Sequence, residues 1–228
     1  MCVAEFIDIG GGDLTIDNVW QLAHGAAEPR IAPEALSRVK RSAQHVDNAL
    51  KRDGVIYGVT TGYGDSCTTD IPADLVAELP LHLTRFHGCG TGRVLNPIET
   101  RAVMAVRLAA LLRGWSGVSV ELVTLLNEML KRDILPLIPA EGSVGASGDL
   151  TPLSYIAGAL VGEREVLMSG RRMMASAAFA EAGLKPITLR PKEALAVMNG
   201  TAVMTGLAAL VYVRAEGLGR LSSRLTAM

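Results

Sequence analysis

The sequence predicts a mainly α-helical protein with a few short strands, and three observations lead to that fold class. Hydrophobic residues make up 49% of the 228 residues but aromatic residues only 4%, so the apolar content is mostly of residue types that favour helices. Apolar residues recur at steps of three and four along several stretches, the spacing of an amphipathic helix. Glycine-rich or proline-containing breaks separate those stretches. The length is sufficient for one or two domains with a sizeable core.

The N-terminal part alternates helices with glycine-rich breaks. Residues 1–13 end in three glycines and predict a loose or strand-like entry, after which Thr15 or Asp17 is a suitable N-cap for a short helix. The apolar spacing predicts an amphipathic helix over 33–52, with a proline at its start. Residues 56–65 carry three glycines and two tyrosines, which indicates an ordered loop rather than a flexible linker.

Three further helices are predicted in the middle of the chain, over residues 73–88, 96–113 and 119–132. The first ends at a glycine-rich stop. The second begins with Asn96 and a proline, and Glu99 stands three residues after the asparagine, which is the pattern of a capping box. Prolines close the third helix.

The C-terminal part is predicted to contain a buried helix over 153–161, a small hairpin over 165–173 around a Ser-Gly turn, and a short helix over 176–183. A last helical region begins near residue 191 and is interrupted at Asn199-Gly200-Thr201. The helix over residues 211–225 has no glycine or proline stop after it. We therefore expect that it packs on something outside this chain, or that the sequence is the front part of a longer protein.

Composition and charge exclude several classes of protein. The net charge of −1 gives no electrostatic case for a nucleic acid or an anionic membrane as partner. Three cysteines without CxxC spacing favour a reducing compartment over a disulfide framework. No signal peptide is recognisable, and no stretch reaches 18 apolar residues without charge, so no membrane span is expected. The histidines are not at ligand spacing and no nucleotide-binding glycine motif is present, so neither a metal nor a nucleotide is expected.

The segment over residues 142–150, Gly-Ser-Val-Gly-Ala-Ser-Gly-Asp-Leu, is richer in tiny residues than a usual surface loop. Glycine lacks a Cβ, so backbone can approach backbone closely here. One interpretation is a tight turn between two helices. In the other, the amide nitrogen of Gly148 attacks the carbonyl of Ala146, and loss of two waters, one with the hydroxyl of Ser147, leaves a five-membered ring with an exocyclic methylene. Such a ring is an electrophile that ordinary side chains do not supply.

Polar residues stand in three other glycine-rich breaks: Tyr57, His87 and Asn199. Each has a simple structural interpretation. A tyrosine beside glycine packs, a histidine at a helix end caps it, and an Asn-Gly pair makes a kink or a C-cap. Helix ends that converge on a pocket would instead make a polar site in an apolar body. The residues alone leave both interpretations open.

Three segments together make the chain resemble the histidine and aromatic amino-acid ammonia-lyase family, which includes aminomutases. Residues 142–150 are similar to the family's cofactor-forming segment, 57–64 to its active-site tyrosine loop, and 192–201 to its asparagine segment. The resemblance implies a cytoplasmic homotetramer of longer chains. It also implies an N-terminal portion with an active-site domain over 1–195 and the start of a long central helix bundle over 196–228.

The same resemblance implies the roles of individual residues. Ala146, Ser147 and Gly148 would condense into 4-methylidene-imidazol-5-one, with Asp149 assisting. A substrate amine would add to the methylene carbon, which makes its nitrogen a leaving group, and Tyr57 would remove the benzylic proton. Asn199 would contact the ring and the substrate. Gly64 and Leu150 match positions that line the family's substrate pocket.

The pair Phe86-His87 falls where the family selects the ring of its substrate. Phe86 offers an apolar wall, and His87 offers a hydrogen bond to a ring hydroxyl or an imidazole nitrogen. We expect an aromatic L-amino-acid substrate of the phenylalanine, tyrosine or dihydroxyphenylalanine type, which a carbon–nitrogen lyase would convert to a trans-2-enoic acid and ammonia. The alternatives are a histidine ammonia-lyase giving urocanate, an aromatic aminomutase, and a helical fragment without activity.

Overall fold

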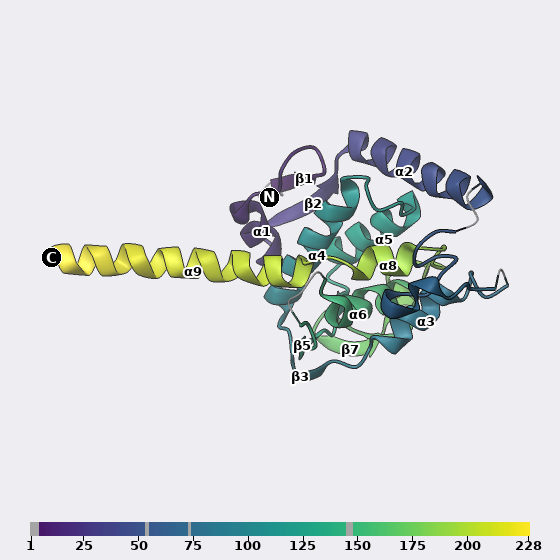
Figure 1. Ribbon diagram of the computed structural model, residues 1–228. Coiled ribbons are helices and arrows are strands. Elements are labelled where there is room, and N and C mark those ends of the chain that lie inside the picture. Colours follow the sequence, from purple (N-terminus) through teal and green to yellow (C-terminus); the bar gives the residue numbers. More distant parts are fainter. Residues whose placement is uncertain (1–4, 53–54, 73, 145–147) are drawn as a thin grey trace.

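The computed structural model describes residues 5–52, 55–72, 74–144 and 148–228, and it confirms a mainly α-helical fold. Figure 1 shows a body of packed helices from which one long helix, α9, projects to the C-terminus. The helices are α1 (Ile16–Ala23), α2 (Pro33–Arg52), α3 (Leu79–Phe86), α4 (Pro97–Leu112), α5 (Val120–Lys131), α6 (Leu150–Leu160), α7 (Ala175–Ala182), α8 (Glu193–Met198) and α9 (Ala202–Ala227), with a 3-10 turn at Gly64–Thr68. The strands are β1 (Glu5–Ile9), β2 (Ala27–Ile31), β3 (Thr91–Val94), β4 (Leu135–Pro136), β5 (Pro139–Glu141), β6 (Glu165–Met168) and β7 (Arg171–Met174).

Local capping residues set several helix starts where the sequence predicts them. Thr15 and Asn18 form a capping box at α1, with 3.1 Å between the Asn18 amide and Thr15 Oγ1. Asn96 and Glu99 form the predicted capping box at α4. The Ser119 side chain accepts from the amide of Leu122 at the start of α5. These caps satisfy amides that have no partner within the helix, so they are readable from a few adjacent residues.

The helix predicted over 73–88 is shorter in the structure, where α3 covers only Leu79–Phe86. Residues 74–78 form turns instead. Pro80 explains the late start, because proline has no amide hydrogen and its ring would clash with the carbonyl four residues earlier. Proline is therefore tolerated only in the first turn of a helix, which is where Pro80 lies.

The short strands lie around the helical body in three small sheets. β1 pairs in parallel with β2, a strand that the sequence analysis did not predict. β6 and β7 form the predicted hairpin, whose turn places Ser169 and Gly170 at φ 51° and 74°. β4 adds to its edge, and β3 pairs with β5.

Helix α4 is the centre of the core and packs against α1, α5 and α9. Its apolar side chains, among them Met104, Leu108 and Leu111, are fully buried. α9 crosses α4 closely because Gly206 has no side chain there. A Cβ at that position would lie 3.0 Å from the backbone of Ala102 and Val103.

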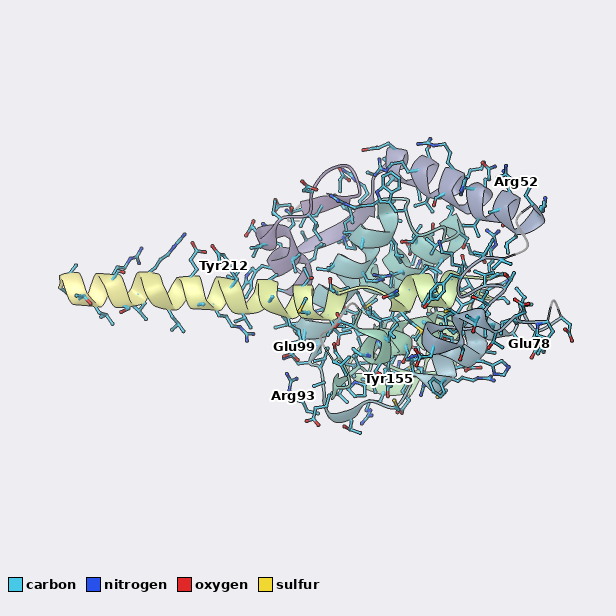
Figure 2. The ribbon with its side chains drawn as sticks, in the orientation of Figure 1. Arg52, Glu78, Arg93, Glu99, Tyr155 and Tyr212 are labelled. Carbon is cyan, nitrogen blue, oxygen red and sulfur yellow. The ribbon has the colours of Figure 1, made fainter. Side chains whose placement is uncertain are left out.

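Beyond this crossing, α9 leaves the body with much of its surface exposed, including Tyr212, which is labelled in Figure 2. By length and composition the stretch Glu193–Ala227 could also cross a membrane, with a mean hydropathy of 1.7 over its most apolar window. Half of that window is buried inside the protein, and core helices pass the same test. The expectation of no membrane partner therefore stays a prediction.

Candidate active site

The short helix α8 brings together three of the segments singled out in the sequence. The tyrosine loop lies against Leu195, since a Cβ at Gly58 would be 2.8 Å from Leu195 Cδ2. The hydroxyl of Thr84 in α3 lies 3.9 Å from the sulfur of Met198. Asn199, the C-cap of α8, lies against Gly148 of the glycine-serine segment. Three segments that lie between residues 57 and 150 thus meet on one six-residue helix.

Crowding at Gly148 is the most specific feature of this site. A Cβ at that position would lie 2.5 Å from Asn199 Oδ1 and 3.3 Å from the amide nitrogen of Gly200. A side chain at this position would have to displace the Asn199 side chain, so glycine fits this packing without rearrangement. Ala146 and Ser147 lie outside the described residues. The structure therefore describes only the glycine end of the predicted ring-forming segment, where the backbone is closely packed against Asn199 and Gly200.

Asp149 joins the segment to two helix N-termini. Its carboxylate is 1% exposed and accepts hydrogen bonds from Ser143 Oγ at 2.6 Å and from the amides of Val203 and Met204 at 2.9 and 3.1 Å. The last two are first-turn amides of α9, so Asp149 caps a helix far away in sequence. Leu150, half-buried against the core, begins α6 directly after it. The positive ends of two helices therefore meet beside the segment.

Tyr57 lies on the surface of the tyrosine loop with 54% of its area exposed. Its hydroxyl oxygen accepts a hydrogen bond of 3.1 Å from the amide of Gly64, whose φ of +57° starts the 3-10 turn. Burial raises the pKa of the neighbouring Tyr63 to about 12, and the charge of an ionised Tyr57 adds to that shift. The amide of Gly64 therefore holds the Tyr57 hydroxyl at the start of the 3-10 turn.

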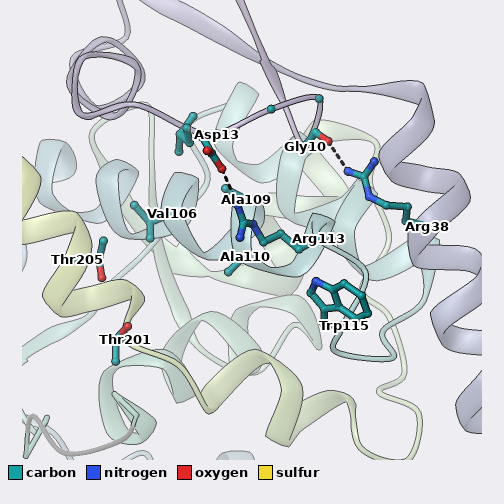
Figure 3. A pocket seen from close by; sticks show the side chains of 13 residues that line it. Gly10, Asp13, Arg38, Val106, Ala109, Ala110, Arg113, Trp115, Thr201 and Thr205 are labelled. Carbon is teal, nitrogen blue, oxygen red and sulfur yellow. Dashed lines mark hydrogen bonds and ion pairs between the residues drawn. The ribbon is translucent and has the colours of Figure 1, made fainter.

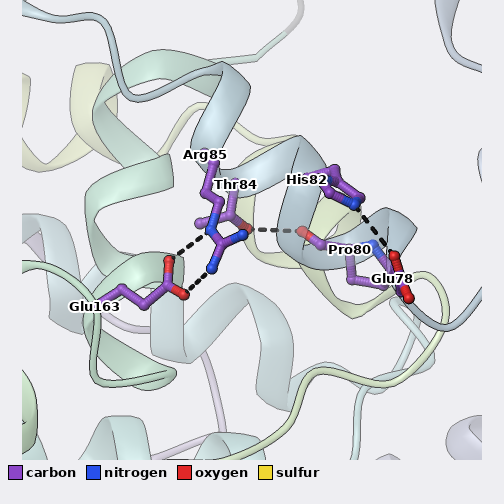
Figure 4. Close-up of polar contacts among 6 residues, drawn as sticks. All are labelled: Glu78, Pro80, His82, Thr84, Arg85 and Glu163. Carbon is purple, nitrogen blue, oxygen red and sulfur yellow. Dashed lines mark hydrogen bonds and ion pairs between the residues drawn. The ribbon is translucent and has the colours of Figure 1, made fainter.

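Phe86 and His87 stand at the outer end of α3, which is fixed by polar contacts shown in Figure 4. Arg85 forms an ion pair with Glu163, and Thr84 Oγ1 donates to the carbonyl of Pro80 at 2.9 Å. The Phe86 side chain is 80% exposed and meets the His87 ring edge-on at 5.2 Å.

The imidazole of His87 has a defined hydrogen-bonding role. Its Nδ1 lies 3.0 Å from the carbonyl oxygen of Leu83, and a carbonyl can only accept, so Nδ1 carries the hydrogen. In the neutral imidazole, Nε2 is then an acceptor. The structure places this pair on a helix that packs on α8, but the described contacts of both rings are local to the end of α3.

Two buried charged residues of this region were missed by the sequence analysis. Arg107 of α4 is 4% exposed and donates to the carbonyls of Ala196 and Asn199. Glu193 is 1% exposed and accepts from the amides of Ser119 and Arg190, both at 2.7 Å. A charge on the apolar face of a helix is a sequence signal for such residues, and Arg107 stands between buried positions of α4.

A separate cavity of about 840 Å³ lies on another part of the surface, between the N-terminal glycines, α2, α4 and the start of α9 (Figure 3). Both of its arginines are engaged, Arg38 with the carbonyl of Gly10 and Arg113 with Asp13 at 2.6 Å. None of the residues predicted to be catalytic or substrate-binding lines it. We therefore place the candidate active site at α8 and not in this cavity.

Comparisons with known proteins bear on the whole chain. Residues 14–228 match the model of a family described as aromatic amino acid lyase. Human histidine ammonia-lyase is 38% identical over 226 residues, which are 98% of this chain and 34% of the human protein. Among solved structures, ergothionase from Treponema denticola superposes with a TM-score of 0.90 at 29% identity, over 94% of this chain and 43% of that one. Tyrosine aminomutase from Streptomyces globisporus has a TM-score of 0.84 at 37% identity, over 93% and 40%. The chain spans less than half the length of these relatives.

The expected preference for a phenylalanine, tyrosine or dihydroxyphenylalanine substrate is wrong. Curated relatives 35% to 42% identical over most of this chain, from human to Bacillus subtilis and Macrococcus caseolyticus, have the name histidine ammonia-lyase. The preference depended in part on Phe86 as an apolar wall, and in part on the likeness of residues 192–204 to the phenylalanine and tyrosine branch of the family. In this chain that side chain is 80% exposed at a helix end.

Proposed function

Since the chain belongs to the aromatic amino acid lyase family, we propose that it is the N-terminal portion of a histidine ammonia-lyase, which eliminates ammonia from L-histidine to give urocanate. The observation that carries the proposal is the contact of Gly148 with Asn199. It joins the predicted ring-forming segment to the predicted polar ligand of that ring. The names of the curated relatives support histidine as the substrate.

The residues present fit an electrophile made from Ala146, Ser147 and Gly148. A Cβ at the glycine position would lie 2.5 Å from Asn199 Oδ1, and Asp149 fixes the segment through its backbone and its carboxylate. The ring would supply a methylene carbon that accepts the substrate amine and makes its nitrogen a leaving group. The N-termini of α6 and α9 favour negative charge beside it.

The remaining roles belong to side chains on the other segments. Tyr57 is the proposed base for the proton on the substrate's β carbon, and the amide of Gly64 holds its hydroxyl oxygen in place. Asn199 orients ring and substrate through its side-chain amide. His87 Nε2 is the proposed acceptor for an imidazole N–H, since its Nδ1 is engaged by Leu83. Gly64 and Leu150 are proposed to line the pocket.

Tyr57, Phe86 and Asn199 lie exposed at the surface of this chain. We propose that the site is completed by protein beyond these 228 residues, in a cytoplasmic homotetramer, with no metal or nucleotide taking part. The division into an active-site domain over 1–195 and a bundle over 196–228 belongs to the same proposal. The structure breaks its helices close to that boundary, between Met198 and Ala202.

The test uses the full-length protein and its Ser147→Ala variant. The unmodified protein should have an intact mass lower than its sequence by two water molecules and should release urocanate from L-histidine. Ser147→Ala should keep the full mass and lose turnover by several orders of magnitude, since the electrophile supplies most of the rate enhancement. Ser176→Ala, at an exposed position of α7, is the matched control and should behave as the unmodified protein. Normal turnover by Ser147→Ala would contradict the proposal.

A second candidate is an aminomutase, which the similarity to tyrosine aminomutase from Streptomyces globisporus favours. The two functions share the same electrophile and base and differ in whether ammonia is returned to the β carbon. Product analysis separates them, because the aminomutase yields a β-amino acid and the lyase only the unsaturated acid. A protein of full mass that forms neither product would instead be a helical assembly domain without activity.

A further inference from the structure

Arg107 is a buried cation beneath the candidate site, in the middle of α4. Its Nη2 donates to the carbonyls of Ala196 and Asn199, the latter at 3.4 Å. Its Nη1 lies against Gly200, where a Cβ would be only 2.0 Å away. The guanidinium therefore supports the Asn199-Gly200 turn from the core side, and the glycine gives it the space.

Burying this charge has a cost. Burial lowers the pKa of Arg107 to about 10, an effect that the negative charge of Asp149 partly offsets. The buried Nε has no hydrogen-bond partner among the described residues. Apolar residues of similar volume often replace buried charges without loss of stability, so packing alone does not explain an arginine here. The contact of Arg107 with the Asn199-Gly200 turn offers an explanation for the buried arginine.

We propose that Arg107 is a positioning residue for formation of the electrophile, because it fixes the Asn199-Gly200 turn against which Gly148 is pressed. The proposal rests on the function proposed above. The contacts of the guanidinium are to the last carbonyls of α8, which have no partner within the helix and which favour a cation. Arg107 thus acts through the turn and does not itself touch the reacting atoms.

Movement of this turn would displace the ring-forming segment, because two contacts connect them. The side chain of Asn199 is the atom group closest to Gly148, and the carbonyl of Gly200 accepts the Asp149 amide at 2.7 Å. Both contacts restrain the backbone directly after the Gly148 nitrogen. That nitrogen forms a bond to the Ala146 carbonyl carbon, whose oxygen leaves as one water. Ser147 loses its hydroxyl and its α-hydrogen as the second, so no oxidant is needed.

The experiment compares full-length Arg107→Met and Arg107→Lys with Arg113→Met. Arg113 is the matched control because it is on the same helix but pairs with Asp13 at the surface. The readouts are the fraction of chains that have lost two waters, by intact mass, and the unfolding midpoint. Arg107→Met should lower that fraction by about tenfold or more, since small displacements cost this much in intramolecular reactions. Arg107→Lys, which keeps the charge and a donor, should recover part of it. Arg113→Met should match the unmodified protein.

Gly200→Ala gives an independent readout, because its methyl group would displace the guanidinium and its backbone does not need a left-handed conformation. It should lower the condensed fraction as Arg107→Met does, and the double variant should be no worse than the more severe single variant. Additive losses would overturn the proposal.

Two further outcomes would also overturn it. One is a folded Arg107→Met with the unmodified protein's condensed fraction. The other is failure of both Arg107 variants to fold while Arg113→Met folds, which would make the role structural. An unmodified protein that keeps both waters contradicts the proposed function itself and is recognised before any variant is compared.

Discussion

At the residue scale, the site depends on charged side chains that are almost fully buried and that each form hydrogen bonds with backbone groups. Asp149 caps α9, Glu193 accepts from the amides at the start of α5 and of α8, and Arg107 donates to the end of α8. Each of these hydrogen bonds contributes more to stability when buried than at the surface. Loss of one partner would leave the other polar group buried with no hydrogen bond to water. Exposed pairs such as Arg30 with Asp8 contribute little by comparison.

Tyr63 gives a residue-scale prediction about pH. Burial raises its pKa in the folded chain to about 12, above the ordinary value of 10.0, so the unfolded chain loses the proton first. The stabilising contribution is therefore complete below about pH 10 and is lost as the pH rises towards about 12. We expect Tyr63→Phe to remove this part of the loss of stability at alkaline pH. The measurement is the free energy of unfolding over that pH range. Tyr212→Phe, at an exposed position of α9, should keep the original slope. An unchanged slope in Tyr63→Phe would show that the phenol is not the titrating group.

At the element scale, the six-residue helix α8 holds the site together. It is too short to be stable alone, and it is fixed by packing against α3, α4 and α6. The predicted break at Asn199-Gly200-Thr201 is confirmed and sends the chain into α9. β2 was not predicted, because a parallel strand pair depends on contacts that no local pattern records.

Gly206 gives an element-scale prediction about the crossing of α9 over α4. A side chain there would meet backbone atoms at 3.0 Å, which cannot move as a flexible side chain can. We expect Gly206→Leu to lower the free energy of unfolding by about 1 to 3 kcal/mol through overpacking, measured by denaturant unfolding. Gly219→Leu is the control on the same helix. No described atom lies within 4 Å of a Cβ at that position, and the substitution should stabilise the helix slightly. Equal effects at both glycines would contradict close packing at the crossing.

At the scale of the whole molecule, the chain is a compact body with one unpartnered arm (Figure 1). Along α9, Met204 and, on the projecting arm, Val211, Leu218 and Leu225 recur at intervals of seven residues, and all are at least 51% exposed. Leu221 stands three residues after Leu218 and is 53% exposed. A seven-residue repeat of apolar side chains is typical of a helix that packs lengthwise along other helices. We call this row of side chains the seam.

The arm gives a prediction about assembly. We expect chains of residues 1–228 to associate through this seam, and the double variant Leu218→Glu with Leu225→Glu to shift the sedimentation-equilibrium mass towards the monomer. Burying a carboxylate in an apolar seam is unfavourable, so the loss should be at least about tenfold in association constant. Ser223→Glu lies on the opposite side of the seven-residue repeat and should leave the mass unchanged. A mass unaffected by the leucine substitutions would rule out the seam as the contact.

Local sequence patterns were sufficient to predict the helical fold class, the capped starts of α1 and α4, the start of α5, and the hairpin of β6 and β7. The sequence by itself also determined the family, through three glycine-rich segments. These features depend on neighbours a few residues apart, where caps, turns and glycine backbones act locally. Only the tertiary structure decided that Gly148 meets Asn199, that Asp149 caps α9 and that Arg107 supports the turn between them. These contacts join residues 51 to 92 positions apart in the sequence. Their energy comes from burying polar groups together, and the pattern of a single chain does not record which distant groups share a buried site.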